Sequence, residues 1–132
     1  MTREDEEMNG STLVAVAMAT AKELPDATHE LPFGPDTDVF KVVGRIFLLA
    51  SELKGEPIIT LKCDPADSEE LRREFSTIIP GYHVNKRLWI TVASSPDITR
   101  ELVQELVVDS YLLTVERLPR SRRPVLPDDL RR

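Results

Sequence analysis

The sequence has very few residues of the types that build covalent, metal and catalytic sites. Its 132 residues include one cysteine, two histidines and five glycines. A single cysteine excludes an internal disulfide and fits a reducing, cytoplasmic compartment. The glycines form no phosphate-binding loop, and no pair of cysteines or histidines stands at a metal-ligand spacing. We therefore expect a protein that is not an enzyme and needs no metal or cofactor.

The sequence also lacks an apolar run long enough for a membrane. Its best candidate, Ser11–Ala21, falls well short of the roughly 20 residues that a spanning helix needs. A secretory signal requires a positive leader, whereas Glu4-Asp5-Glu6-Glu7 precedes this run. We expect a buried helix in a cytoplasmic protein that does not associate with membranes.

Charge is distributed unevenly along the chain. The formal net charge is −6, which opposes non-specific attraction to nucleic acid. Residues 1–30 carry two basic and seven acidic side chains, and residues 120–132 carry five arginines and two aspartates. Charged ends are usually solvated. We expect a disordered acidic segment at residues 1–10, a single domain at residues 11–119 and a flexible tail rich in Arg and Pro at residues 120–132.

Proline and glycine divide the first half of the chain into a helix and several strands. The helix is expected at residues 12–24, with Ser11 as its cap and Pro25 at its end. Residues 28–33 favour a short edge strand. Runs rich in Val, Ile and Phe predict three further strands, at residues 38–43, 45–51 and 57–62.

The connections between these strands are expected to differ. A β-branched residue disfavours positive φ, so at Val43-Gly44 we expect a type I turn with Gly44 in a bulge position. Residues 52–56 are expected to form a loop.

Two cap-plus-proline signals mark helix starts in the second half. Asp64-Pro65 supplies a capping carboxylate and a proline at the first helical position, and Leu71 and Phe75 form the buried side. Ser95-Pro96-Asp97 predicts a last helix that runs to about residue 118. Between the helices, alternation places two sets of residues on opposite faces of a strand: Leu88, Ile90 and Val92 on one, Arg87, Trp89 and Thr91 on the other.

This order predicts an α+β domain with three helices and about five strands: helix, three strands, helix, two strands, helix. The links between the strands are too short for parallel crossovers, so the sheet is expected to be antiparallel. Helices against one face of that sheet give a two-layer domain.

Several segments follow one family pattern: Leu31–Gly34, Phe40–Phe47, Leu61–Pro65, Pro80–Trp89, Ser110-Tyr111 and Leu118-Pro119. Through them, residues 25–119 resemble the MmcQ/YjbR family of small bacterial proteins. The resemblance implies a fold like that of secretion chaperones and a DNA-binding role with a "double wing" arrangement. The family usually has Met, His and Asn where this sequence has Val84, Leu88 and Ile90, so two polar side chains are missing from the central block.

The central block is also where basic and aromatic residues interleave. Cations can neutralise phosphates, polar side chains can donate hydrogen bonds, and aromatic rings can stack on bases. On this interpretation a nucleic-acid surface combines the block with the preceding hairpin: Tyr82, His83, Asn85, Lys86, Arg87 and Trp89, with Lys41 and Arg45. The alternative is that Gly81 and Asn85 shape turns, Trp89 covers the sheet and the cations are solvated.

Cys63, His83 and Asn85 have the composition of a thiol-protease triad, and His29 could join Cys63 and His83 as metal ligands. Cys63 shares a strand face with Ile59 and Leu61, which favours a buried structural thiol. We expect no catalytic or metal-ligating residues.

Two functions of different classes follow. The first is a binding module for DNA, with weak, salt-dependent phosphate contacts. The second is a chaperone- or adaptor-like module whose exposed sheet edge or apolar face binds a partner protein. The local cations favour the first, and the overall acidity favours the second.

Overall fold

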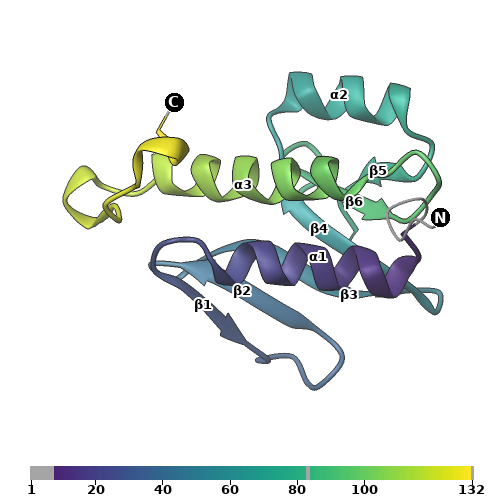
Figure 1. The fold of residues 1–132 in the computed structure, drawn as a ribbon, viewed down its shortest axis with the longest axis horizontal. Coiled ribbons are helices and arrows are strands. Elements are labelled where there is room, and N and C mark those ends of the chain that lie inside the picture. The colour runs from purple at the N-terminus through teal and green to yellow at the C-terminus, as the bar shows by residue number, and fades with distance from the viewer. Residues whose placement is uncertain (1–7, 83, 132) are drawn as a thin grey trace, which may run out of the picture.

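The computed structural model describes residues 8–82 and 84–131. In this part of the chain, three α-helices and six strands follow one another in the order α-β-β-β-β-α-β-β-α (Figure 1). The α+β class is confirmed, and the additional strand is the short edge strand that residues 28–33 favoured. The elements are α1 (Gly10–Lys22), β1 (Ala27–Glu30), β2 (Asp38–Val42), β3 (Arg45–Leu53), β4 (Glu56–Lys62), α2 (Pro65–Glu74), β5 (Ile78–Pro80), β6 (Trp89–Ala93) and α3 (Arg100–Glu116).

The six strands form one antiparallel sheet in the order β1-β2-β3-β4-β6-β5. The first four strands are consecutive neighbours, as short hairpin connections require. Helix α2 then carries the chain across, so that β5 becomes an edge strand and β6 fills the position beside β4. This crossover brings the central block of the sequence next to the end of β4.

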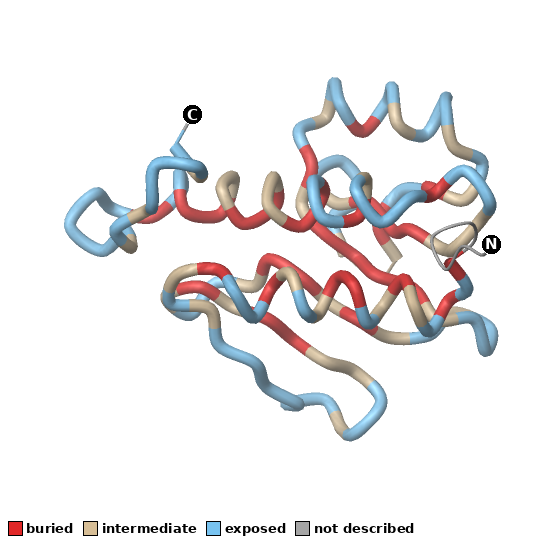
Figure 2. Tube along the Cα trace, viewed as in Figure 1, coloured by how far each residue is buried: buried red, intermediate tan, exposed pale blue. Residues whose placement is uncertain are grey.

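Alternation along the strands separates two buried layers. Ile59 and Leu61 of β4 belong to the main core cluster with α1 and α3, whereas Ile58 and Thr60 face the opposite way. On that second face, the hydroxyl of Thr60 lies 2.9 Å from the hydroxyl of Thr91. Helices α1 and α3 pack on each other and on the central strands. Figure 2 shows the buried residues concentrated in this layer, with α2 mostly exposed above it.

A side chain from α3 ties the helix to the sheet. The Ser110 hydroxyl donates to the Phe47 carbonyl at 2.6 Å and accepts from the Lys62 N–H at 2.9 Å, so it bridges β3 and β4. The next residue, Tyr111, donates its hydroxyl to the Pro25 carbonyl at 2.7 Å, and its ring packs edge-on against Phe47. These bonds fix the end of β4 relative to α3.

The expected starts of the first and last helices were each wrong by a few residues. Asn9, not Ser11, caps α1, because its Oδ1 accepts from the Thr12 N–H at 2.8 Å. The helix is buried along one face only. Thr99 caps α3, and Ser95-Pro96-Asp97 forms a separate turn closed by the Ile98 N–H on the Ser95 carbonyl. That turn points Ile98 into the core before the helix begins.

The start of α2 follows the sequence prediction. Asp64 Oδ1 accepts from the Ala66 N–H at 2.9 Å, and Pro65 is the first helical residue. Leu71 and Phe75 pack against the core cluster but are only half-buried. None of the helices in the described residues is long and apolar enough to cross a bilayer.

Both hairpin turns of the central strands differ from expectation. Val43 and Gly44 have φ values of 47° and 77°, and Lys54 and Gly55 have φ values of 54° and 82°. Two consecutive positive φ values are the mark of a type I′ turn, whose twist matches that of the flanking strands. The fit between the strands therefore outweighs the preference of Val43. Within the loop expected at residues 52–56, only Lys54 and Gly55 form a turn, and the other three residues belong to β3 and β4.

Leu88 is not a core residue. Strand β6 begins at Trp89, and Leu88 is 40% exposed at the end of the preceding loop, where its N–H donates to the Asn85 carbonyl. Ile90 and Val92 are fully buried, as the alternation predicted. The alternation does not extend to Leu88 because the regular strand has not yet begun.

Candidate functional site

Most of the predicted binding residues lie in the loop between β5 and β6. Its first residue, Gly81, donates its N–H to the Trp89 carbonyl at 2.9 Å. A Cβ at Gly81 would lie 2.7 Å from the Cβ of Trp89, a distance that needs a shift of the backbone. The next N–H, that of Tyr82, donates to Thr91 Oγ1 at 2.9 Å. The start of the loop is therefore held closely against β6.

Two of the predicted residues have bonds within the loop itself. Asn85 Oδ1 accepts from the Arg87 N–H at 2.9 Å, which is an Asx turn. Lys86 Nζ donates to the Gly81 carbonyl at 3.0 Å. To contact a phosphate, Lys86 must give up this bond. Arg87 is exposed, and His83 lies outside the described residues.

The two cations of the β2–β3 hairpin have different surroundings. Lys41 Nζ lies 3.1 Å from Glu30 Oε1 on the neighbouring strand, so its charge is compensated. Arg45 is exposed at the first position of β3. Within residues 8–82 and 84–131, it has no acidic side chain at ion-pair distance. Of this pair, only Arg45 offers an uncompensated charge.

Lys62, at the end of β4, links the two predicted regions. It pairs in register with Trp89, and its Nζ lies 5.6 Å from the centroid of the indole ring. Burial lowers the pKa of Lys62, and the positive charges of Arg117 and Arg45 lower it further. Arg117 is the C-cap of α3. We call Arg45, Lys62 and Arg117, together with the adjacent Trp89, the basic corner.

The structure thus places Arg45 and Trp89 on the strands to either side of Lys62 and adds two residues that the sequence did not indicate. Lys62 and Arg117 were missed because the register of β4 with β6 and the packing of α3 set their positions. Alternation assigned Lys62 and Trp89 each to one face of its own strand. No short sequence pattern shows that β4 and β6 pair so that these two side chains lie on the same face of the sheet. In Figure 1 the end of α3 lies on the same side of the molecule as the β2–β3 turn, which leads into Arg45.

The single thiol lies next to the basic corner but in the opposite electrostatic field. Cys63 is buried, as expected. Burial raises its pKa to about 11, and the carboxylates of Asp67, Asp64 and Asp109 add to the effect. Because the thiolate is the nucleophile, these surroundings suppress reactivity. In the described part of the chain, no group of three His, Cys, Asp or Glu side chains is arranged to hold a metal ion.

Comparison with known proteins decides the family. The YjbR family model matches residues 22–113. The chain belongs to the YjbR family. The match includes β1 to β6 and most of α3, and therefore Arg45, Lys62 and Trp89 of the basic corner. Arg117 and the C-terminal tail lie beyond the matched residues.

Relatives cover most of the chain. YbdF of Escherichia coli O157:H7 is 42% identical over 121 residues, which are 91% of this chain and 99% of that protein. YjbR of Escherichia coli strain K12 is 33% identical over 86 residues, 65% of this chain and 73% of its own. The crystal structure of Deinococcus radiodurans protein DR2400, with the domain DUF419, has a TM-score of 0.74 and 32% identity, covering 92% of this chain and 89% of that one.

A protein from Pseudomonas syringae has the same fold, with a TM-score of 0.66 and 26% identity over 81% of this chain and 99% of its own. Both Escherichia coli relatives are uncharacterised proteins. Family membership therefore fixes the fold, and function has to be argued from the geometry of this chain.

Proposed function

We propose that this YjbR-family protein is a non-enzymatic binding module whose basic corner contacts phosphate groups of nucleic acid. The observation that carries the proposal is the placement of Arg45, Lys62 and Arg117. Their charges are close enough to lower the pKa of Lys62, and none of them has an ion pair among the described residues. A phosphate between them would relieve their mutual repulsion.

Trp89 suits the same ligand. Its ring is half-buried beside Lys62, so one part of the indole is held by the sheet and another part is exposed to a base. Stacking on an aromatic ring tolerates any base sequence. Contacts with phosphate carry no sequence information, so binding should be weak and tolerant of sequence. The net charge of −6 weakens it further at low salt.

The test is fluorescence anisotropy of a labelled DNA duplex titrated with protein at several salt concentrations. With two or three phosphate contacts, the log–log salt slope should be roughly −2 to −3. Arg45→Ala with Arg117→Ala should reduce the slope by about 1 to 2 and weaken binding to every duplex alike. Arg72→Ala with Arg73→Ala is the matched control, since it removes two exposed arginines from α2.

Lys86→Ala with Arg87→Ala should have a smaller effect, because Lys86 is bonded to Gly81. Absence of binding even at low salt would contradict the proposal. Equal loss in the Arg45/Arg117 and Arg72/Arg73 variants would show that only total charge matters.

A second candidate is a protein-interaction module, and a specific observation favours it. Leu31 and Phe33 are 51% and 70% exposed in the segment that joins β1 to β2. They follow β1, an edge strand whose outer backbone groups can pair with an extended peptide. Retention of a partner by immobilised protein should fall on Phe33→Ser, while Val125→Ser, at a residue 86% exposed in the tail, serves as the control. Equal retention by both variants would exclude this surface.

A further inference from the structure

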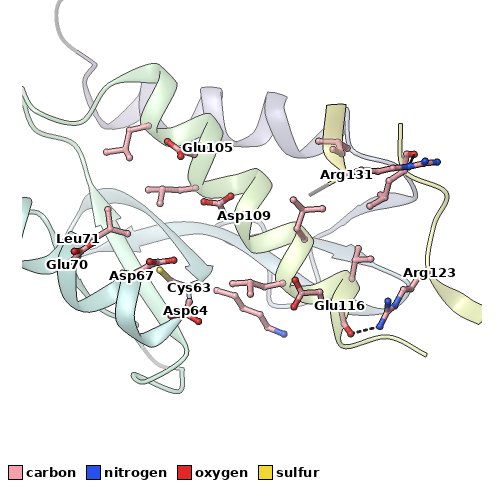
Figure 3. Close-up of a pocket in the computed structure, with 18 of the residues that line it drawn as sticks. Cys63, Asp64, Asp67, Glu70, Leu71, Glu105, Asp109, Glu116, Arg123 and Arg131 are labelled. Carbon is pink, nitrogen blue, oxygen red and sulfur yellow. Dashed lines mark hydrogen bonds between the residues drawn. The ribbon is translucent and has the colours of Figure 1, made fainter. Parts of the chain in front are cut away.

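A groove of about 720 Å³ lies between α2, α3 and residues 123–131 (Figure 3). It exists because α2 packs mainly on β5, so that the two helices form separate walls. Ser68 is the only buried residue of α2 in the described chain. Leu71, on the side of α2 that lines the groove, packs against the core but is only half-buried, so this side is only partly covered.

The groove is lined by leucine side chains from three elements. They are Leu71 of α2, Leu102, Leu106, Leu112 and Leu113 of α3, and Leu126 and Leu130 of the C-terminal tail. An apolar lining of this size can remove several apolar side chains of a ligand from water, which favours binding.

The rim of the groove is strongly acidic. Figure 3 shows carboxylates on both walls, and seven acidic residues line the groove: Asp64, Asp67, Glu70 and Glu74 on the α2 side, and Glu105, Asp109 and Glu116 on α3. The negative field reaches the floor, where Asp67, Asp64 and Asp109 add to the raised pKa of Cys63.

Three basic residues also line the groove: Lys62, which belongs to the basic corner, and Arg123 and Arg131, which are engaged elsewhere. Arg123 donates to the Glu116 and Leu118 carbonyls at 2.8 and 2.9 Å, and so caps the end of α3. Arg131 lies 3.6 Å from Asp128. Apart from Asp109, the rim carboxylates have no ion pair within residues 8–82 and 84–131, and acidic residues outnumber basic ones in the lining, so the groove is negatively charged overall.

The tail of the chain shows which chemistry suits this surface. Leu126 and Leu130 are four residues apart and pack against the core cluster, while Arg123 and Arg131 flank them. At one end of the groove, the tail thus already places leucines against the core and arginines beside them. A partner that offers the same chemistry would extend it.

We propose that the groove docks an amphipathic helix of a partner protein, with an apolar stripe flanked by Lys and Arg. Both long walls are helices whose backbone groups bond internally, so the groove offers no sheet edge for an extended peptide. Recognition must then come from side chains, as in other helix-in-groove complexes. This proposal is independent of nucleic-acid binding at the basic corner.

The experiment uses the full chain and a fluorescein-labelled synthetic peptide of about 18 residues, or five helical turns. Leucines repeat at helical spacing, and lysines flank the stripe. One control peptide has the same composition in shuffled order, and another carries Glu in place of Lys. We expect micromolar binding of the designed helix alone, measured by anisotropy. If the shuffled peptide binds equally well, only charge attraction is present and the proposal fails.

Variants locate the binding. Glu70→Lys with Glu105→Lys reverses one exposed carboxylate on each wall and should weaken the designed helix by at least about tenfold. Glu69→Lys with Glu101→Lys changes the charge equally on the same two helices, outside the groove, and should have little effect. Equal weakening by both pairs, or no binding of the designed helix, would overturn the proposal. If the first pair fails to fold by circular dichroism, Glu70→Gln with Glu105→Gln replaces it and should weaken binding about threefold.

Discussion

Two consecutive residues, Lys62 and Cys63, lie in opposite electrostatic surroundings. Lys62 belongs to the basic corner, where Arg117 and Arg45 assist burial in lowering its pKa. Cys63 lies on the floor of the acidic groove, where Asp67 and Asp64 assist burial in raising its pKa to about 11. The boundary between the two surfaces thus falls at the end of β4.

The comparison shows how little the net charge of −6 says about partners. The fold sorts cations to the ends of β4 and α3 and carboxylates to the facing sides of α2 and α3. Each surface then attracts a ligand of opposite charge. The basic corner and the acidic groove both depend on the position of the end of β4. Substitutions that move this end should therefore affect both surfaces, whereas substitutions of single charges should affect only one of them.

The largest effect is expected from the strand that carries Trp89. Ile90 is fully buried, so Ile90→Ala should lower the free energy of unfolding by about 2–5 kcal/mol. Leu88→Ala, two residues away, should cost about 0.5 kcal/mol or less because Leu88 is substantially exposed. Urea denaturation measures both. A large loss of stability in Leu88→Ala would mean that Leu88 is buried and that β6 begins before Trp89, with a different pairing to β4.

The alkylation rate of the Cys63 thiol measures the electrostatic surroundings in the acidic groove. With a pKa of about 11 rather than 9.0, its thiolate at pH 8 should be about 100-fold less abundant than that of an ordinary cysteine. Alkylation should be slow in native protein and fast after denaturation. Asp67→Asn should speed native alkylation, whereas Arg117→Gln should not. Rapid alkylation of the native protein at pH 8 would contradict this description of the groove.

Substitution of Ser110 tests the hydrogen bonds that hold the end of β4 against α3, on which both surfaces depend. Ser110→Ala removes the bridge and leaves the Lys62 N–H and the Phe47 carbonyl without that partner, at a cost of about 1–3 kcal/mol. Thr114→Val is the control, because the Thr114 hydroxyl bonds only within its own helix, to the Ser110 carbonyl. If Ser110→Ala is no more destabilising than the control, the bridge does not hold the end of β4.

Local signals in the sequence predicted much of the fold. The start of α2 was correct because a carboxylate and a proline act on adjacent backbone groups, and the strands were found because alternation is local. The errors lie where distant parts of the chain decide. Val43 adopts a positive φ because the turn must match the twist of two strands. Ile98 lies in a separate turn before α3 because its side chain is buried in the core.

The candidate site was less predictable for the same reason. Arg45 and Trp89 could be selected by residue type, but Lys62 and Arg117 join them only through strand register and helix packing. Lys86 and Asn85 have the expected chemistry, yet both are bonded within their loop. No sequence pattern predicted the acidic groove, because its two walls, α2 and α3, are far apart in the sequence and face each other only in the folded protein.

The smallest and sharpest effect concerns Lys62 itself. Its folded pKa lies below its unfolded value, so the unfolded state binds more protons and stability should rise slightly as pH rises toward the ordinary lysine range. Arg117→Gln removes the larger of the two repulsions and should raise the pKa of Lys62, as seen by NMR titration of its side-chain signals.

A duplex bound at the basic corner should also raise the pKa of Lys62, since phosphate favours the charged ammonium. The groove peptide, whose lysines would add positive charge near Lys62 at the edge of the groove, should not raise the pKa of Lys62 and should slow the alkylation of Cys63. If the duplex leaves the Lys62 titration unchanged while it binds, the phosphates lie elsewhere on the protein.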